Sequence, residues 1–347
     1  MMERNYNEKN YNSLDLWKFI MSLAVVAIHT QPLINVTNTY AQTLCTIFVS
    51  MAVPFFFLAS GYLLAKKMDW NYDTNDFIRI KLLCIKFVKL YFVWTIIYSP
   101  LAIYHYYKEA TPPLRAVLVY IRGLFFVGEH YNSWPLWYLL SAIYTLLVIL
   151  LFMKLCKRPL GLIVLSLVAS ILCFGITAYV NYNGTYDTPP ELIRKLFVYS
   201  IGSGRIFTGL IYIPLGMLLS RKEIPTILNW SLLLLSSLPR FFFGSDFLAG
   251  YLTILSAVGL FGIINNFSLK DNGLYRNLRT YSTTIYFIHM YVWSIYYMLI
   301  YGKKTYGPDS FFVTALLSIT LAILYAHHVK KKKHHSIQAT TTNELLN

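Results

Sequence analysis

Two residues in the first apolar stretch of the sequence have side chains suited to proton transfer and anion binding. Lys18 and His29 are eleven positions apart in a run that is otherwise apolar. Eleven residues of α-helix complete about three turns, so both side chains lie on one helix face, roughly 16 Å apart along the axis. A histidine titrates near neutral pH and can act as a general base, and a lysine can bind phosphate as a point charge.

The spacing of this pair leaves two interpretations open. Ionisable side chains at membrane depth are functional candidates. Alternatively, Lys18 extends its ammonium group to the lipid headgroups and His29 bonds to a neighbouring helix. The surrounding elements and the other motifs must therefore decide between function and structure.

The composition indicates an integral membrane protein. Of 347 residues, 56% are hydrophobic and 13% are charged, which is half of the roughly 25% that is typical of soluble domains. We predict an all-α bundle of about ten transmembrane helices in one domain, residues 1–333, followed by a polar cytoplasmic tail or linker over residues 334–347. The expected spans are 15–36, 42–65, 82–105, 134–154, 159–181, 204–220, 226–243, 246–266, 281–302 and 309–329, and a short apolar stretch at 115–127 is expected to be interfacial or re-entrant.

The distribution of basic residues predicts the topology. Twenty of the 30 Lys and Arg residues fall in segments expected inside and nine in segments expected outside, with Lys18 left uncounted. The positive-inside rule then requires an even number of crossings, with both termini in the cytoplasm. The first apolar stretch lacks a small-residue cleavage pattern, so we expect it to be retained as an anchor. The net charge of +15 matches attraction to anionic lipid rather than nucleic-acid binding. The four cysteines lack CxxC spacing, so neither disulfides nor a metal site is expected.

Three motifs resemble those of one family. The first is the basic residue, ten residues and histidine of the first span; the second is the run Val53–Tyr62, which ends in Ser-Gly-Tyr; the third is the late run Tyr281–His289. Together they resemble the acyltransferase-3 family of bacterial membrane proteins. Within it, Val53–Tyr62, Leu136–Tyr138 and Gly204–Phe207 are most similar to the membrane domain of vancomycin-resistance serine racemases.

This resemblance implies a function in the bacterial cell membrane. Family members transfer an acyl group other than aminoacyl, commonly acetyl, from cytoplasmic acyl-CoA to a hydroxyl or amine on the outer side. His29 would be the general base, and Lys18, Lys86 and Lys89 would hold the CoA phosphates or position the thioester. No metal is implied.

The same resemblance suggests residues that bind the acceptor. These are Arg205, His289, Ser60, Tyr62 and Trp137. Three of them also have a structural interpretation: Arg205 and Trp137 suit the membrane interface, and His289 suits core packing.

The sequence departs from the family pattern at one carboxylate. Many members have an acidic residue after the tryptophan of the fourth span, whereas this chain continues from Trp137 with Tyr-Leu-Leu-Ser-Ala. No Asp or Glu is expected inside a span, so His29 has no evident carboxylate partner, although Glu129 or Asp246 could fold over it from outer loops.

Two other functions remain open. The chain could be an amino-acid transport domain, bringing serine to or from a cytoplasmic racemase domain attached after the tail, or a passive anchor. A transporter is expected to contain a broken helix facing its substrate, for which Gly202–Gly204 with Pro214 is the nearest candidate. A transferase instead needs a cytoplasmic CoA pocket that reaches His29.

Overall fold

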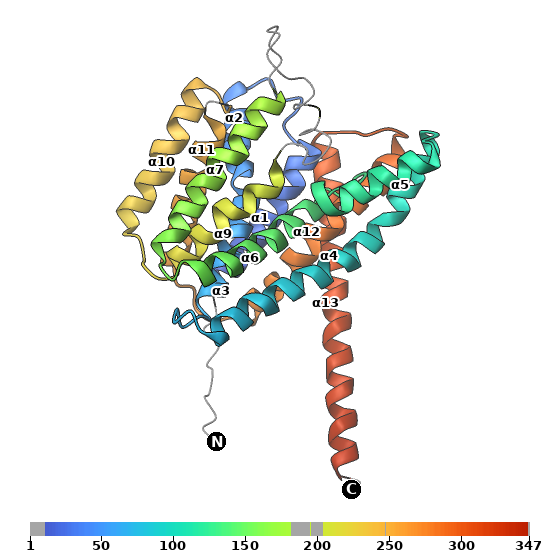
Figure 1. The fold of residues 1–347 in the computed structure, drawn as a ribbon. Coiled ribbons are helices and arrows are strands. Elements are labelled where there is room, and N and C mark those ends of the chain that lie inside the picture. Colours follow the sequence, from blue (N-terminus) through green and yellow to red (C-terminus); the bar gives the residue numbers. More distant parts are fainter. Residues whose placement is uncertain (1–10, 182–194, 196–203, 247, 346–347) are drawn as a thin grey trace. The chain divides into compact units, whose positions relative to one another are not determined.

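The structure is a computed structural model that describes residues 11–181, 195, 204–246 and 248–345 (Figure 1). Within these residues the secondary structure is entirely helical. The helices are α1 Asn12–Thr30, α2 Thr39–Ser50, α3 Ala52–Ala65, α4 Thr74–Lys108, α5 Pro113–Arg122, π-helix η1 Gly123–Val127, α6 Leu136–Leu155, α7 Leu160–Asn181, 3₁₀-helix η2 Arg205–Phe207, α9 Thr208–Leu219, α10 Thr226–Phe243, α11 Ala249–Asn266, α12 Gly273–Ile300 and α13 Pro308–Leu345.

The chain divides into two compact units. The first unit joins residues up to Pro32 with those from Ile264 onward, and the second comprises Leu33–Ile263. Segments that are distant in sequence thus meet in the first unit, whereas the second is continuous. Each unit is described by itself.

The first unit consists of α1, α12 and α13. Helix α12 packs against both α1 and α13, and their apolar contacts centre on buried Val26, Ile285 and Ala322. The span expected at 15–36 is too long at its end, because α1 stops at Thr30 and Gln31 takes a left-handed conformation (φ 46°). A residue before proline is disfavoured in a helix, and Gln31 precedes Pro32.

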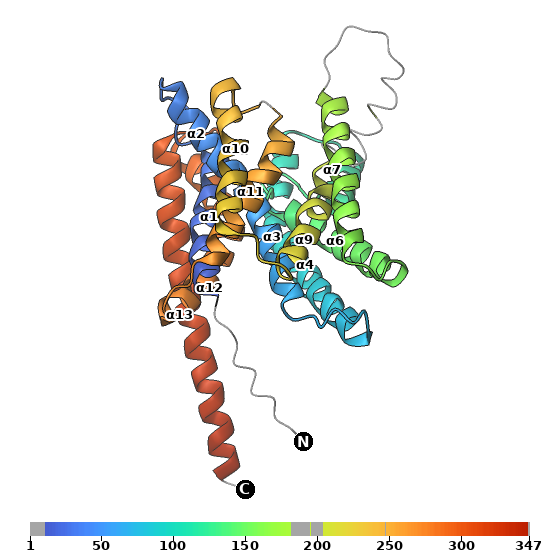
Figure 2. The ribbon, with the colours of Figure 1, turned by 90° about the vertical axis from the view of Figure 1, so that its left-hand side faces the viewer.

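Helix α13 continues beyond the apolar part of its sequence. It runs as far as Leu345, so the expected polar tail is helical up to that residue. Figures 1 and 2 show this end of α13 projecting past α12. At the other end, the Gly307 N–H donates to the carbonyl of Thr30 (2.8 Å), which ties the start of α13 to the end of α1.

The second unit is built around the contact between α3 and α9. Helix α9 also packs on α7, and α4 packs on α6. At Gly61 and Gly216 the two central helices approach so closely that an added methyl group would meet the carbonyl of Ile213 or of Leu58. The motif Val53–Tyr62 therefore lies at the centre of this unit.

Seven helices of the described part of the chain are long and apolar enough to cross a membrane. They are Asn12–Thr30, Thr39–Ala65, Leu136–Leu155, Leu160–Thr177, Thr226–Phe243, Ala249–Asn266 and Pro308–Lys331. A shorter apolar helix covers Arg205–Leu219. The apolar stretch at 115–127 forms most of α5 and all of η1.

Candidate functional site

In the first unit, His29 and His289 lie against each other. His29 is in the last turn of α1 and His289 is in the middle of α12, and their rings stack with centroids 5.3 Å apart and planes at 24°. His289 is fully buried. Its Nδ1 lies 3.1 Å from the carbonyl oxygen of Ile285, and because a carbonyl only accepts, Nδ1 carries the proton in this contact. Nε2 of His289 is then the unprotonated nitrogen, and the described residues offer it no hydrogen-bond partner.

Lys18 lies beside a carboxylate that we did not expect within a helix. Asp15 is in the first turn of α1 and its side chain is 2% exposed. Arg279 of α12 donates to both of its oxygens, from Nε at 3.0 Å and from Nη2 at 2.7 Å, and Lys18 Nζ is 3.8 Å from Oδ1. The expectation that no acidic residue lies inside a span was therefore wrong. The signal was present in the sequence as Asp15 three positions before Lys18, one helical turn apart.

Lys86 and Lys89 belong to the second unit. Both side chains are exposed on α4, and their spacing of three residues places them on one side of that helix. Their proposed cooperation with Lys18 involves both units and remains a prediction.

Three of the expected acceptor-binding residues have packing contacts in the second unit. The hydroxyl of Ser60 on α3 lies 2.9 Å from the hydroxyl of Tyr138 on α6. The ring of Trp137 lies against Phe57 with centroids 6.0 Å apart. Tyr62 is buried, with Lys66 Nζ 5.2 Å above its ring. These contacts explain why the Ser-Gly-Tyr motif and the tryptophan segment occur together, and any role in acceptor binding stays a proposal.

Arg205 pairs with an acid that the sequence suggested for His29. Its Nη1 lies 3.7 Å from Oε2 of Glu129. Burial raises the pKa of Glu129, and the nearby charges of Arg205 and Arg122 oppose that shift. The charges of two guanidinium groups of its own unit thus act on Glu129. Gly204, just before Arg205, has φ 76°, whereas Gly202 and Ser203 of the suggested broken helix lie outside the described residues.

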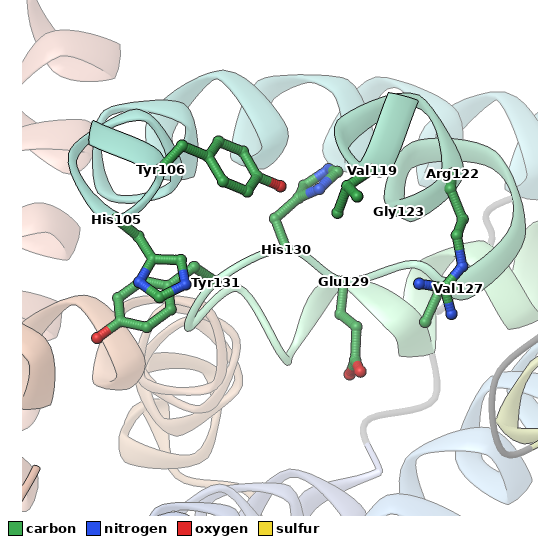
Figure 3. Close-up of a pocket in the computed structure, with 9 residues that line it drawn as sticks. All are labelled: His105, Tyr106, Val119, Arg122, Gly123, Val127, Glu129, His130 and Tyr131. Atoms are coloured by element: carbon green, nitrogen blue, oxygen red, sulfur yellow. The ribbon is translucent and has the colours of Figure 1, made fainter. Parts of the chain in front are cut away.

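A pocket of about 230 Å³ opens beside Glu129 (Figure 3). Two parallel ring pairs form part of it or stand next to it: His105 on Tyr131, with centroids 3.8 Å apart, and Tyr120 on His130, with centroids 4.0 Å apart. Its lining residues are His105, Tyr106, Val119, Arg122, Gly123, Val127, Glu129, His130 and Tyr131. Figure 3 shows the Tyr106 hydroxyl pointing toward the ring of His130. The sequence signal that we missed is the dipeptide His-Tyr, which occurs at His105-Tyr106 and again at His130-Tyr131.

His130 is the most deeply buried ionisable group of this pocket. The residue is 8% exposed, and neither ring nitrogen has a hydrogen-bond partner among the described residues. Burial lowers its pKa to about 4, so the imidazole is neutral at physiological pH. A neutral imidazole has one donor and one acceptor.

The wall formed by η1 is held by two tyrosines. Tyr91 of α4 donates to the carbonyl of Leu124, and Tyr144 of α6 donates to that of Phe125, both at 2.7 Å. π-Helical turns occur often at functional sites. Within the described residues, no cluster of three His, Cys, Asp or Glu side chains is placed to hold a metal ion.

A comparison with protein families matches residues 11–327 to the acyltransferase domain of the acyltransferase-3 family. The chain belongs to this family. Its membership and its seven apolar helices make it a multi-pass membrane protein, and its relatives are bacterial. His29 and His289 of the first unit, and the Ser60 and Arg205 contacts of the second, all lie inside the matched region.

Two curated relatives are amino-acid racemases from Enterococcus faecalis. One is 27% identical over 214 residues, which cover 59% of this chain and 28% of the relative. The other is 29% identical over 147 residues, covering 39% of this chain and 19% of the relative. The chain thus spans less than a third of either relative's length. No solved structure matches.

Proposed function

We propose that this protein is a membrane acyltransferase that moves an acyl group, most simply acetyl, from cytoplasmic acyl-CoA to a hydroxyl or amine on the outer side. The family match over residues 11–327 is the observation that carries the proposal. The stacked His29 and His289 support it, because they place two imidazoles together within one helical unit.

His29 acts as the general base in this proposal. It removes the proton from the acceptor hydroxyl or amine, whose oxygen or nitrogen then attacks the thioester carbonyl. The carbon–sulfur bond breaks, and the CoA thiolate leaves and takes the proton back from the imidazolium. General base catalysis of this kind contributes about 10²- to 10⁴-fold. His289, held by its bond to Ile285, positions the His29 ring.

We assign Lys18, as part of the Asp15 cluster, a role in donor binding. Arg279 makes three contacts with the Asp15 carboxylate and so balances its charge. The cluster contains one carboxylate and two cationic side chains, so it has a net positive charge, which suits the anionic phosphates of CoA. Lys86 and Lys89 provide further positive charge from α4.

We also propose ten spans with both termini in the cytoplasm. The seven apolar helices and the shorter helix Arg205–Leu219 supply eight. Helices α4 and α12 contain 35 and 28 residues, or about 52 and 42 Å at 1.5 Å per residue, and both exceed the roughly 30 Å hydrocarbon layer. The charged residues of α12 lie near its start, and those of α4 lie in its first half except for Lys108 at its end, which leaves an apolar part of each helix long enough to cross.

Calorimetry of acetyl-CoA binding to the purified protein tests the donor. We expect micromolar binding that weakens at least tenfold in Lys18→Ala and is largely retained in Lys18→Arg, because the charge is the shared feature. Lys303→Ala, in the loop before α13, is the matched control. Absence of binding at millimolar acetyl-CoA would contradict the transferase proposal.

A second candidate is an amino-acid transport domain that serves a racemase. Two observations favour it: the relatives carry the name amino-acid racemase, and the pocket combines Arg122 with Glu129, charges that complement a carboxylate and an ammonium group. The helical end of α13 would then be the linker to a cytoplasmic racemase domain. Uptake of labelled serine into proteoliposomes tests this alternative, with Glu129→Gln expected to abolish uptake; a rate equal to that of empty liposomes would exclude serine transport.

A further inference from the structure

The loop between α3 and α4 has a fixed and strained conformation. Trp70 and Tyr72 both have left-handed backbones, with φ 57° and 54°, which is uncommon for residues other than glycine. The carboxylate of Asp76 is fully buried and accepts the N–H groups of Asp69 (2.9 Å) and Tyr72 (3.1 Å). Strain of this kind persists only where the surrounding structure holds it, and it is often found at functional positions.

This loop presents aromatic rings beside a guanidinium group. The guanidinium carbon of Arg221, just after α9, lies 4.8 Å from the ring centroid of Trp70. The ring of Tyr72 meets that of Trp70 edge-on, with centroids 6.4 Å apart. Trp70 is half-buried and Arg221 is exposed, so part of the indole surface remains open beside a cation.

Basic residues lie in the sequence on both sides of this loop and at the ends of α6 and α9. Lys154 near the end of α6 contacts the start of α4, with Nζ 6.0 Å from the ring centroid of Phe77. Other exposed basic residues follow the ends of the same helices: Lys66 and Lys67 after α3, Lys157 and Arg158 after α6, and Lys222 after α9. The same segments contain four acids, Asp69, Asp73, Asp76 and Glu223, of which Asp69 pairs with Arg79 and Asp76 accepts backbone N–H groups. An aromatic ring amid clustered cations suits a ligand with a planar base and phosphates.

We propose that this loop binds the nucleotide end of the acyl donor, with the adenine stacked on Trp70 and the ribose 3′-phosphate held by Arg221 and the neighbouring lysines. The inference rests on the proposed acyl-CoA donor and on the cytoplasmic side assigned to this loop. Lys86 lies twelve residues beyond Thr74, or about 18 Å along α4. The diphosphate and the pantetheine arm can therefore extend along α4 from the loop toward Lys86 and Lys89.

Truncated donors test this assignment with the full-length protein. Affinities for acetyl-CoA, adenosine 3′,5′-bisphosphate and S-acetylpantetheine are measured by calorimetry in wild type, Trp70→Ala, Trp70→Phe and Arg221→Gln. Trp230→Ala, at an exposed tryptophan of α10, is the matched control. Base stacking on an aromatic residue is worth about 1–3 kcal/mol, so we expect acetyl-CoA and bisphosphate to bind about tenfold or more weakly in Trp70→Ala and Arg221→Gln. Trp70→Phe should retain most of the affinity, and S-acetylpantetheine should bind all variants equally.

The outcomes separate this inference from the proposed function. In one outcome, the wild type binds acetyl-CoA while Trp70→Ala and Arg221→Gln bind it with the same affinity as Trp230→Ala. In that case the nucleotide assignment is wrong and the donor proposal stands. If the affinity for S-acetylpantetheine falls as much as that for acetyl-CoA in these variants, the loop affects folding or binding of the pantetheine arm, and the assignment is also wrong. If wild type binds neither acetyl-CoA nor the bisphosphate, both proposals fail. Trp70-dependent binding of the bisphosphate without acetyl transfer would support the loop and contradict the transferase.

Discussion

At the scale of single residues, the Asp15 carboxylate organises the basic side chains of the first unit. It is 2% exposed and contacts both Lys18 and Arg279. Removing one partner of a buried ion pair costs about 3–5 kcal/mol, and because Arg279 is 48% exposed we expect a smaller loss of about 1–3 kcal/mol in Asp15→Asn. Thermal unfolding in detergent measures it. The control is Asp69→Asn, which removes an exposed pair with Arg79 and should lower the free energy of unfolding by less than about 1 kcal/mol. Equal losses in the two variants would contradict the role of Asp15.

The buried His130 predicts a pH dependence of stability. Its pKa is about 4 in the folded protein and about 6.5 when unfolded, so the unfolded state binds the additional proton between these values. The contribution of His130 to the free energy of unfolding is fully present above about pH 6.5. It is lost as the pH falls toward 4, by up to about 3 kcal/mol. The midpoint of thermal unfolding should fall over this range in wild type. His130→Phe keeps a ring on Tyr120 without the titration and should flatten the profile; parallel profiles would contradict this account.

At the scale of helices, the contact of α3 with α9 depends on glycine. A methyl group at Gly61 would meet the carbonyl of Ile213, whereas one at Gly175 on α7 would meet nothing within 4 Å. Overpacking typically costs about 1–3 kcal/mol, so Gly61→Ala should lower the thermal midpoint. Gly175→Ala should leave it unchanged or raise it, because alanine favours a helix by up to about 1 kcal/mol. A neutral Gly61→Ala would show that α3 and α9 are not in close contact.

Helices were predictable from sequence where long apolar runs define them, and their ends were not. Position 31 was expected inside the first span, but the proline that follows it ends the helix there. The long helix α4 begins at Thr74, eight residues before the expected span, because Asp73 caps its start by accepting the N–H of Asp76 at 3.0 Å. Polar turns of a helix outside the apolar run give no hydropathy signal.

At the scale of the whole molecule, the contacts that form the candidate site join distant parts of the sequence. Lys18 and His29 were predictable because eleven residues of helix fix their common face. The partners of this pair were not, since Asp15 and Arg279 are 264 positions apart and no local pattern records their pairing. The pocket beside Glu129 was missed because its rings come from α4, α5 and the loop before α6.

The proposed ten spans place Thr111 outside and Lys222 inside. After replacement of the four native cysteines, a single cysteine at position 111 should react with a membrane-impermeant maleimide added to intact cells. A cysteine at position 222 should react only after permeabilisation. Labelling of both from the same side would require an even number of crossings between them and would contradict the topology.

Acetyl transfer in proteoliposomes tests the central claim most directly. The purified protein receives labelled acetyl-CoA with a panel of hydroxyl and amine acceptors, and both CoA thiol release and labelled product are followed. We predict release above that of empty liposomes, reduced about 100-fold or more in His29→Ala and unchanged in His328→Ala, which alters an exposed histidine of α13. Equal rates for the two variants, or no release by wild type with any acceptor, would contradict the account of this protein as a His29-dependent acyltransferase.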